Sequence, residues 1–371
     1  MILWVKEYGD KLTLQQVSLL TKKEISVKVL EKVEMITNQD VVVVTNADPS
    51  LKSEDFYRYT ILVYEEVFQA LTENILDELH YHYDYHYLKN ALSKSTNSQI
   101  DTIITGSSYG LFGIDTAMLE RAVNLSLMSQ DLYYSLKGIY HVLERNSGIK
   151  QIVLCCSYYY FFTDLSKVTN QKELQRITKV YDKLYGDVHN CHLLPPDRRI
   201  LIQSDIFDVS KLLYLYSVSE YQKGYFYSDG RPRSRFATKE WEDKTKTWEE
   251  LSDFEKIAAA QRRTEAHNKL KKRVSSLQEN KKLLDELSLF CEKRGINLHI
   301  VVVPSTKYYQ EFLDKEYKDI FYEVLNQAGG VIQVWDLAEE EFPDEKFNDM
   351  DHLNELGARV MTELILNITE S

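Results

Sequence analysis

Beyond about residue 99, short apolar runs alternate with longer segments in which apolar residues recur at helical spacing. The run 149–156 is almost continuously apolar, which is typical of a strand buried on both faces of a parallel sheet. We therefore predict an α/β fold, a three-layer sandwich in which helices flank a central, mostly parallel sheet. The predicted strands are 101–105, 121–125, 149–156, 298–303 and 331–335, and the predicted helices are 130–144, 258–294 and 353–366.

The first hundred residues follow a different pattern. Val41–Val44 is an apolar run bounded by Asn and Asp, which predicts a buried strand, whereas 55–92 carries apolar residues at helical spacing. We expect 1–98 to form an N-terminal extension that packs on an α/β domain spanning 99–371. Within that domain, residues 193–254 break the alternation with proline and glycine turns, and we interpret them as an inserted lid.

Composition and charge narrow the class of protein. The chain of 371 residues is 44% hydrophobic and 27% charged, which is ordinary for a globular protein with a large core. Its net charge of −12 argues against binding nucleic acid or an anionic membrane surface, because both need a basic surface. No run approaches the roughly 18 apolar residues of a membrane span, and the start lacks the apolar core of a signal peptide. We expect a cytoplasmic protein without a membrane span.

A serine that follows one of the predicted strands is the candidate nucleophile. The strand 101–105 runs into the turn Gly106-Ser107-Ser108, and parallel sheets place their ligands at the carboxyl ends of strands. Serine is a weak nucleophile, so it needs a base, a group that orients the base, and N–H donors for the oxyanion. The turn at Gly106 frees backbone N–H groups around Ser108 for this last role.

The candidate base and its orienting carboxylate occur near the other end of the chain. Asp349 precedes His352 by three residues, a spacing that can turn the carboxylate onto the imidazole. In this role Asp349 fixes the tautomer of His352, and His352 takes the proton from the attacking serine. Asp351 is the rival orienting residue.

Two segments together resemble the SGNH, or GDSL-type, hydrolase superfamily. They are ITGSSYG around Ser108 and DMDHLNELGA around His352, and they occur in the order found in that superfamily. The resemblance covers about 100–165 and 258–368 and implies that Ser108, His352 and Asp349 form the catalytic triad. GSS in place of GDS, and the final DxDHLNxxGA, look most like the branch of D-alanyl transfer proteins of teichoic acid and alginate-type O-acetyltransferases.

The resemblance also implies where the oxyanion donors lie. VNLSLMSQ resembles the second block of the superfamily, and Ser126 stands where we expect its glycine, whose N–H is an oxyanion donor. The third block falls at Cys156-Ser157-Tyr158, where the usual asparagine is absent. We therefore expect an oxyanion hole made by the backbone N–H groups of Ser108 and Ser126, helped by Ser157.

The function implied is that of a serine-dependent esterase or O-acyltransferase. Its partners would be a small-molecule or glycan substrate and a carbohydrate or other polar acyl acceptor. The process implied is surface-polysaccharide modification. No cofactor is expected beyond an acyl donor. The absent third-block asparagine favours an alternative, in which a catalytically weakened SGNH fold acts as a binding or assembly protein of a polysaccharide pathway.

Other polar clusters offer weaker candidates. HYHYDYHY, residues 80–87, would align His80, His82, Asp84 and His86 on one face of a strand as zinc ligands, but a helix would scatter them. We predict a helix there and no metal site. Residues set aside as loop, cap or surface positions are Arg231, Arg233, Arg235, Asp164, His267 and Asn268.

Overall fold

The computed structural model divides the chain into two units, which are described separately. One comprises Met1–His82 and Pro195–Lys223, and the other comprises Tyr83–Leu194 and Gly224–Ser371. This division differs from the expected boundary after residue 98, since 83–98 belongs with the α/β unit, and part of the expected lid groups with the N-terminal residues. The structure describes residues 2–5, 26–29, 35–37, 41–44, 60–63, 81, 83–191, 232–237, 246–338, 340 and 342–370.

The described part of the first unit is a four-stranded sheet. Its strands are β1 (Ile2–Val5), β2 (Ser26–Val29), β3 (Val41–Val44) and β4 (Thr60–Val63). All pairs are parallel, in the order β2-β1-β3-β4, and β3 confirms the predicted strand. The helix predicted over 55–92 is wrong at β4. Three of its four residues are β-branched, and pairing with β3 overrides the helical spacing of the surrounding sequence.

The second unit is built on a five-stranded sheet in which every strand is parallel to its neighbours. Its strands are β5 (Thr102–Gly106), β6 (Ala122–Asn124), β7 (Gln151–Cys156), β8 (Asn297–Val302) and β9 (Gln333–Asp336). These confirm the five predicted strands to within about two residues. The order is β6-β5-β7-β8-β9, so the direction of winding reverses between β5 and β7. Open parallel sheets bind ligands at the carboxyl end of such a reversal.

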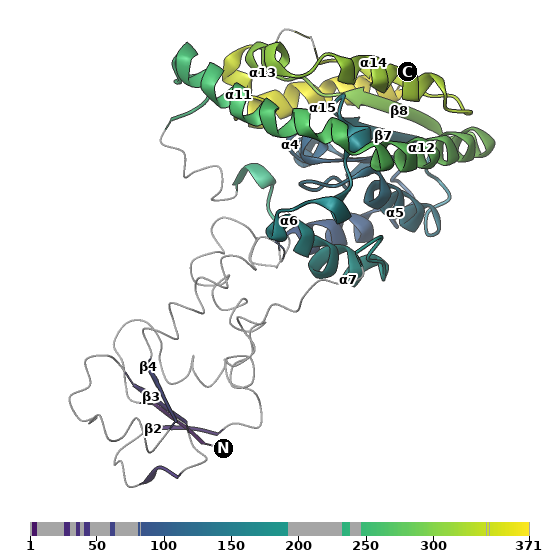
Figure 1. Cartoon of the computed structure of the whole chain (residues 1–371). Coiled ribbons are helices and arrows are strands. Elements are labelled where there is room, and N and C mark those ends of the chain that lie inside the picture. The colour runs from purple at the N-terminus through teal and green to yellow at the C-terminus, as the bar shows by residue number, and fades with distance from the viewer. Residues whose placement is uncertain are drawn as a thin grey trace. The chain divides into compact units, whose positions relative to one another are not determined.

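Helices flank this sheet on both faces (Figure 1). They are α4 (Ser108–Gly113), α5 (Leu132–Leu143), α6 (Gln171–Arg176), α7 (Asp182–Tyr185), α11 (Asp253–Asn268), α12 (Val274–Arg294), α13 (Lys307–Phe312), α14 (Glu316–Asn326) and α15 (Glu355–Glu370). α4 packs on β5 and β7 and against α15, whereas α5 and α12 pack on each other and on β5 and β8. Right-handed connections between parallel strands place these two groups on opposite faces. The unit therefore has the predicted α/β architecture.

The predicted helix 258–294 is two helices. α11 ends at Asn268, and α12 begins only after a 3-10 turn at Lys269–Lys272. The hydroxyl of Tyr317 sits at this break, accepting from the Lys271 N–H and donating to the His267 carbonyl. The break is thus stabilised by a residue 46 positions away from Lys271, which local periodicity does not reveal.

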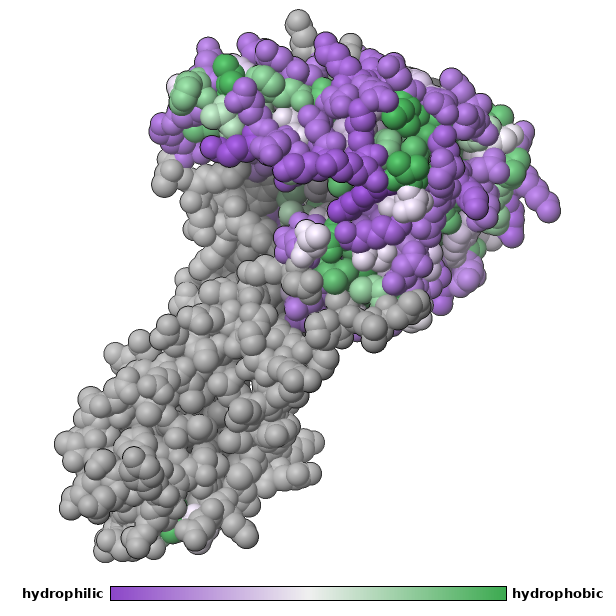
Figure 2. All heavy atoms as spheres, in the orientation of Figure 1, coloured by the Kyte–Doolittle hydropathy of each residue, from purple (hydrophilic) through white to green (hydrophobic). Residues whose placement is uncertain are grey.

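The surface of the second unit is mostly polar on the face drawn in Figure 2, where hydrophobic residues form only small patches. A few large hydrophobic side chains, such as Phe254 and Val331, are exposed, which is normal for a globular protein. None of the helices that the structure describes is both long and apolar enough to cross a membrane.

Candidate active site

Ser108 opens α4 immediately after β5, and a glycine makes this turn possible. Gly106 ends β5 with a φ of +136°, and a Cβ there would lie 2.0 Å from the carbonyl oxygen of Cys155. Glycine is required for so close an approach of two backbones. The Ser107 side chain caps α4 by accepting a hydrogen bond from the Tyr109 N–H, which leaves Ser108 at the first position of the helix.

Ser108, His352 and Asp349 form a continuous hydrogen-bonded chain. The Nε2 atom of His352 lies 2.9 Å from the Oγ of Ser108. On the other side of the ring, Nδ1 lies 3.1 Å from each carboxylate oxygen of Asp349. Because a carboxylate can only accept, Nδ1 carries the proton and Nε2 is left to accept from the serine hydroxyl. This is the geometry of a nucleophile, its base and the carboxylate that orients the base.

The segment before α15 holds His352 in place. The backbone N–H of His352 donates to Asp349 at 2.8 Å, so the same carboxylate fixes both the main chain and the ring. Two aromatic rings from α4 enclose the imidazole, Tyr109 at 5.5 Å and Phe112 edge-on at 5.2 Å between ring centroids. The side chain of His352 is only 7% exposed, so water has little access to the ring.

The rival carboxylate, Asp351, lies beside the triad but is used differently. It is fully buried, and its nearer oxygen lies 3.6 Å from Nδ1 of His352, beyond hydrogen-bonding distance. Its other oxygen accepts from the Tyr109 hydroxyl at 2.9 Å and from Nε of Arg263 at 3.2 Å. Asp349 is therefore the orienting residue in this geometry, and Asp351 supplies a second negative charge nearby.

These charges set the proton affinity of the base. Burial by itself lowers the pKa of His352, but the carboxylates of Asp349 and Asp351 outweigh burial, so the pKa is raised above its usual value. Burial raises the pKa of Asp349, yet the attraction of His352 and its hydrogen bond hold that pKa well below its usual range. The imidazolium that forms when His352 takes a proton is thus stabilised.

The backbone N–H of Ser126, which we predicted as an oxyanion donor, has an acceptor within its own turn. Ser126 is fully buried, and its backbone N–H donates to the side chain of Asn124 at 3.0 Å. That amide in turn donates to the carbonyl of Gly110 at 2.9 Å, which ties α4 to the segment after β6. Gly110 of α4 lies close to Ser126, since a Cβ on Gly110 would lie 2.2 Å from the Ser126 hydroxyl oxygen.

Ser157 and Ser108 line different cavities. Ser108 lines a cavity of about 340 Å³, together with Ser129, Tyr159 and other residues. Ser157 instead lines a cavity of about 450 Å³ that also contains Ser305. Ser129 has a φ of +55°, a conformation that is uncommon for a residue other than glycine and that often marks functional sites.

α11 brings two further polar residues to the cavity of Ser108. Arg263 and His267 are four positions apart, so they share one face of the helix, and both line this cavity. His267 lies 3.4 Å from the Tyr159 hydroxyl and 2.5 Å from that of Tyr309, and burial lowers its pKa to about 3. The helical spacing was visible in the sequence, but only packing shows which side of α11 faces the site.

The remaining candidates have other places in the structure. His80, His82 and Arg231 lie outside the described residues. Asp84 is buried within ion-pair distance of Arg176 at 2.9 Å and Arg235 at 3.7 Å, in a helix over 83–94. This pairing removes Asp84 as a zinc ligand. Arg235, which we set aside as a loop position, is buried instead. In the described part of the chain, two groups have metal-ligand spacing, Asp349-Asp351-His352 and Asp131-Asp164-His189.

The chain was compared with known protein families and with curated proteins. No family model matches it, and no curated protein does so either.

Proposed function

We propose that the chain is an SGNH-type, serine-dependent esterase or O-acyltransferase that acts on a carbohydrate or other polar acyl acceptor. The observation that supports this most directly is the hydrogen-bonded chain from Ser108 through His352 to Asp349. Its position at the carboxyl edge of a parallel sheet, where the winding reverses, agrees with how such folds bind substrates. The resemblance of the two motif segments suggests a role in surface-polysaccharide modification.

The proposed reaction has two halves. Ser108 Oγ attacks the acyl carbonyl while His352 Nε2 takes the hydroxyl proton, and the leaving alcohol then receives that proton from His352 as the ester bond breaks. In the second half, water or an acceptor hydroxyl gives its proton to His352 and attacks the acyl-serine. His352 then returns that proton to Ser108 Oγ as the bond between the acyl group and the serine breaks, which restores Ser108. Asp349 stays ionised throughout and stabilises the imidazolium.

The cavity lining suits a hydroxylated acceptor. Tyr159 contributes an aromatic ring to the cavity lining, and Thr163 and Arg263 add hydrogen-bonding groups in the same cavity. Aromatic faces combined with polar groups are well matched to a sugar ring, which has apolar faces and hydroxyl edges. The volume of about 340 Å³ lies at the small end of ligand pockets, so one sugar unit or a short acyl group fits better than a long lipid.

Acetyl transfer from p-nitrophenyl acetate tests this function. The parent should release p-nitrophenol in a burst, and added monosaccharide should appear as its acetyl ester if the chain is a transferase. His352→Ala should lose this activity, whereas Ser305→Ala, a serine of the other cavity, should keep it. Hydrolysis that persists unchanged in His352→Ala would contradict the proposal.

A binding or assembly role is the second candidate. It is favoured by the placement of Ser126 and Ser157, neither of which lines the cavity of Ser108. Loss of one oxyanion donor costs roughly a hundredfold or more in rate. A chain that binds oligosaccharide but forms no acyl-serine under any condition would support this candidate instead.

A further inference from the structure

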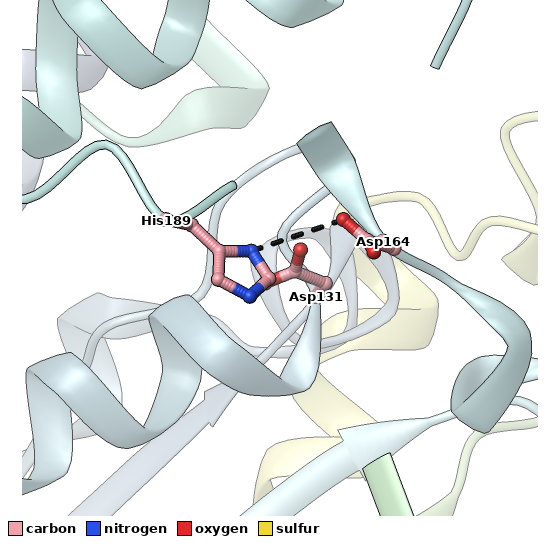
Figure 3. A group of neighbouring side chains, drawn as sticks. All are labelled: Asp131, Asp164 and His189. Carbon is pink, nitrogen blue, oxygen red and sulfur yellow. Dashed lines mark ion pairs between the residues drawn. The ribbon is translucent and has the colours of Figure 1, made fainter. Parts of the chain in front are cut away.

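Three side chains outside the catalytic triad converge on one point from separate segments (Figure 3). Asp131 caps the start of α5, Asp164 caps the 3-10 turn Leu165–Lys167 after β7, and His189 lies in the turn after α7. Each offers one ligand atom, and these three atoms lie within 4.8 Å of one another. Residues far apart in the sequence thus present two carboxylates and an imidazole to the same small space.

The imidazole of His189 has an unsatisfied nitrogen that points into this space. Its side chain is only 6% exposed, and Nδ1 has no hydrogen-bond partner. Its other nitrogen, Nε2, lies 2.9 Å from a carboxylate oxygen of Glu279. The amide nitrogen of Asn190 also lies 3.1 Å from Nε2. The shorter contact, with Glu279, favours the tautomer that has the proton on Nε2 and a lone pair on Nδ1, because a carboxylate can only accept. Metal-binding histidines are commonly oriented by a carboxylate in this way.

The backbone and a stacked ring hold His189 in this orientation. Its φ of +50° is uncommon for a residue other than glycine, and its N–H donates to Asp187 at 2.7 Å. The ring of Tyr133 stacks on the imidazole with 3.7 Å between centroids. A strained backbone that is held this firmly is characteristic of ligand sites.

The buried carboxylates of Asp131 and Asp164 favour the binding of a cation. Among the described residues, no lysine or arginine pairs with Asp131, whose oxygens accept only backbone N–H groups from Tyr134 and Leu165. Burial raises the pKa of Asp131 to about 6, and the nearby carboxylate of Asp164 adds to this. Asp164 has more partners, since Lys167 lies 2.7 Å from its Oδ2 and Ser166 donates its N–H and its hydroxyl to Oδ1. The lone pair on Nδ1 of His189 faces the buried carboxylates of Asp131 and Asp164. This arrangement is unfavourable unless a positive charge lies between the nitrogen and the two carboxylates.

We propose that Asp131, Asp164 and His189 form a site for one divalent transition-metal ion of the zinc class. The 3.8 Å between Nδ1 of His189 and Oδ1 of Asp164 is too long for a hydrogen bond, but an ion with two bonds of about 2 Å bridges it. One nitrogen and two oxygen ligands suit zinc, whereas magnesium and calcium prefer oxygen alone. The other group, around His352, differs because both ring nitrogens there already have partners.

The ion would link three segments of the chain. They are the start of α5, the 3-10 turn after β7 and the turn after α7 that contains His189. Asp164 also lines the cavity of Ser108, so the ion would fix one wall of that cavity. Lys167 would keep partners when the ion binds, because its ammonium also contacts the hydroxyls of Ser275 and Ser276. The site does not depend on the acyl-transfer function, since none of its residues belongs to the triad.

Zinc titration of the chelator-stripped full chain, in competition with a chromophoric chelator, tests the site. The parent should bind one equivalent tightly, and His189→Gln should weaken binding at least about a hundredfold. Glu279→Gln, which changes a partly exposed residue, should weaken it about tenfold or more by releasing the imidazole. His352→Gln is the matched control and should bind zinc as the parent does.

Thermal unfolding gives an independent readout that does not require activity. Zinc should raise the Tm of the parent and of His352→Gln, because it binds the folded state, but should not raise that of His189→Gln. A parent that binds neither Zn²⁺ nor Mn²⁺ would overturn the proposal. That result would mean that a protonated His189, rather than an ion, balances the two carboxylates. Binding that is lost in His352→Gln but kept in Glu279→Gln and His189→Gln would also overturn it, by placing the ion at the triad.

Discussion

The Nε2 atom of His352 lies 2.9 Å from the Oγ of Ser108, although 244 residues separate them in the chain. Ser108 follows the first strand of the five-stranded sheet, and His352 precedes the last helix. The two meet because α4 packs against α15 on one face of that sheet. The parallel fold thus joins two motifs, each of which is common on its own.

The two carboxylates beside the base should have unequal importance. Asp349→Asn should lower kcat by about 10⁴-fold, because the amide no longer holds the proton on Nδ1. Asp351→Asn keeps the shape of the side chain and should cost only about tenfold, because Asp351 acts through charge at 3.6 Å. Ester hydrolysis by the two purified variants measures this difference, and equal losses would show that Asp351 also orients the ring.

The pH dependence of kcat/KM follows from the raised pKa of His352. The neutral imidazole is the base, so activity should rise with pH and its inflection should lie above the ordinary value of about 6.5. Removing the charge of Asp351 should move the inflection to lower pH. An inflection below about 6 in the parent would mean that burial, rather than the two carboxylates, dominates the pKa.

Glycine at the turn before the nucleophile should be indispensable for folding. Gly106→Ala forces a Cβ to within 2.0 Å of a backbone oxygen at a φ of +136°, and should destabilise the fold by more than about 3 kcal/mol. Gly186→Ala is the matched control, since its φ is also positive but no atom lies within 4 Å of the added carbon. Its cost should be about 1 kcal/mol. Chemical denaturation of both variants separates the clash from the backbone strain.

The buried ion pairs of Asp84 should be structural. Asp84→Ala leaves the charges of Arg176 and Arg235 buried without their carboxylate, which should cost about 3–5 kcal/mol. His86→Ala, on the same helix, should cost far less because His86 is partly exposed. A small loss of stability in Asp84→Ala would show that water replaces the carboxylate.

The sequence predicted the five strands of the α/β unit because their apolar runs are short and bounded by polar turns. It did not predict β4, whose four residues lie inside a longer segment of helical spacing, because parallel pairing with β3 decides their conformation. The division of 258–294 at Lys269–Lys272 was also not predicted, since a tyrosine from α14 stabilises it.

The juxtaposition of Ser108, His352 and Asp349 could be predicted because each residue lies in a short motif. The side-chain acceptor of the Ser126 N–H could not be predicted, because it depends on how Asn124 folds back onto its own turn. Arg263 and His267 depend on how α11 packs. Asp131, Asp164 and His189 come together only when three turns are placed in space.

Covalent labelling by a fluorophosphonate, followed by intact mass, tests the central claim most directly. The account predicts one adduct on the parent and on Ser305→Ala, and none on Ser108→Ala, because His352 activates only the serine at 2.9 Å. A folded Ser108→Ala protein that is labelled as fast as the parent, or a folded parent that is not labelled at all, would contradict an activated Ser108.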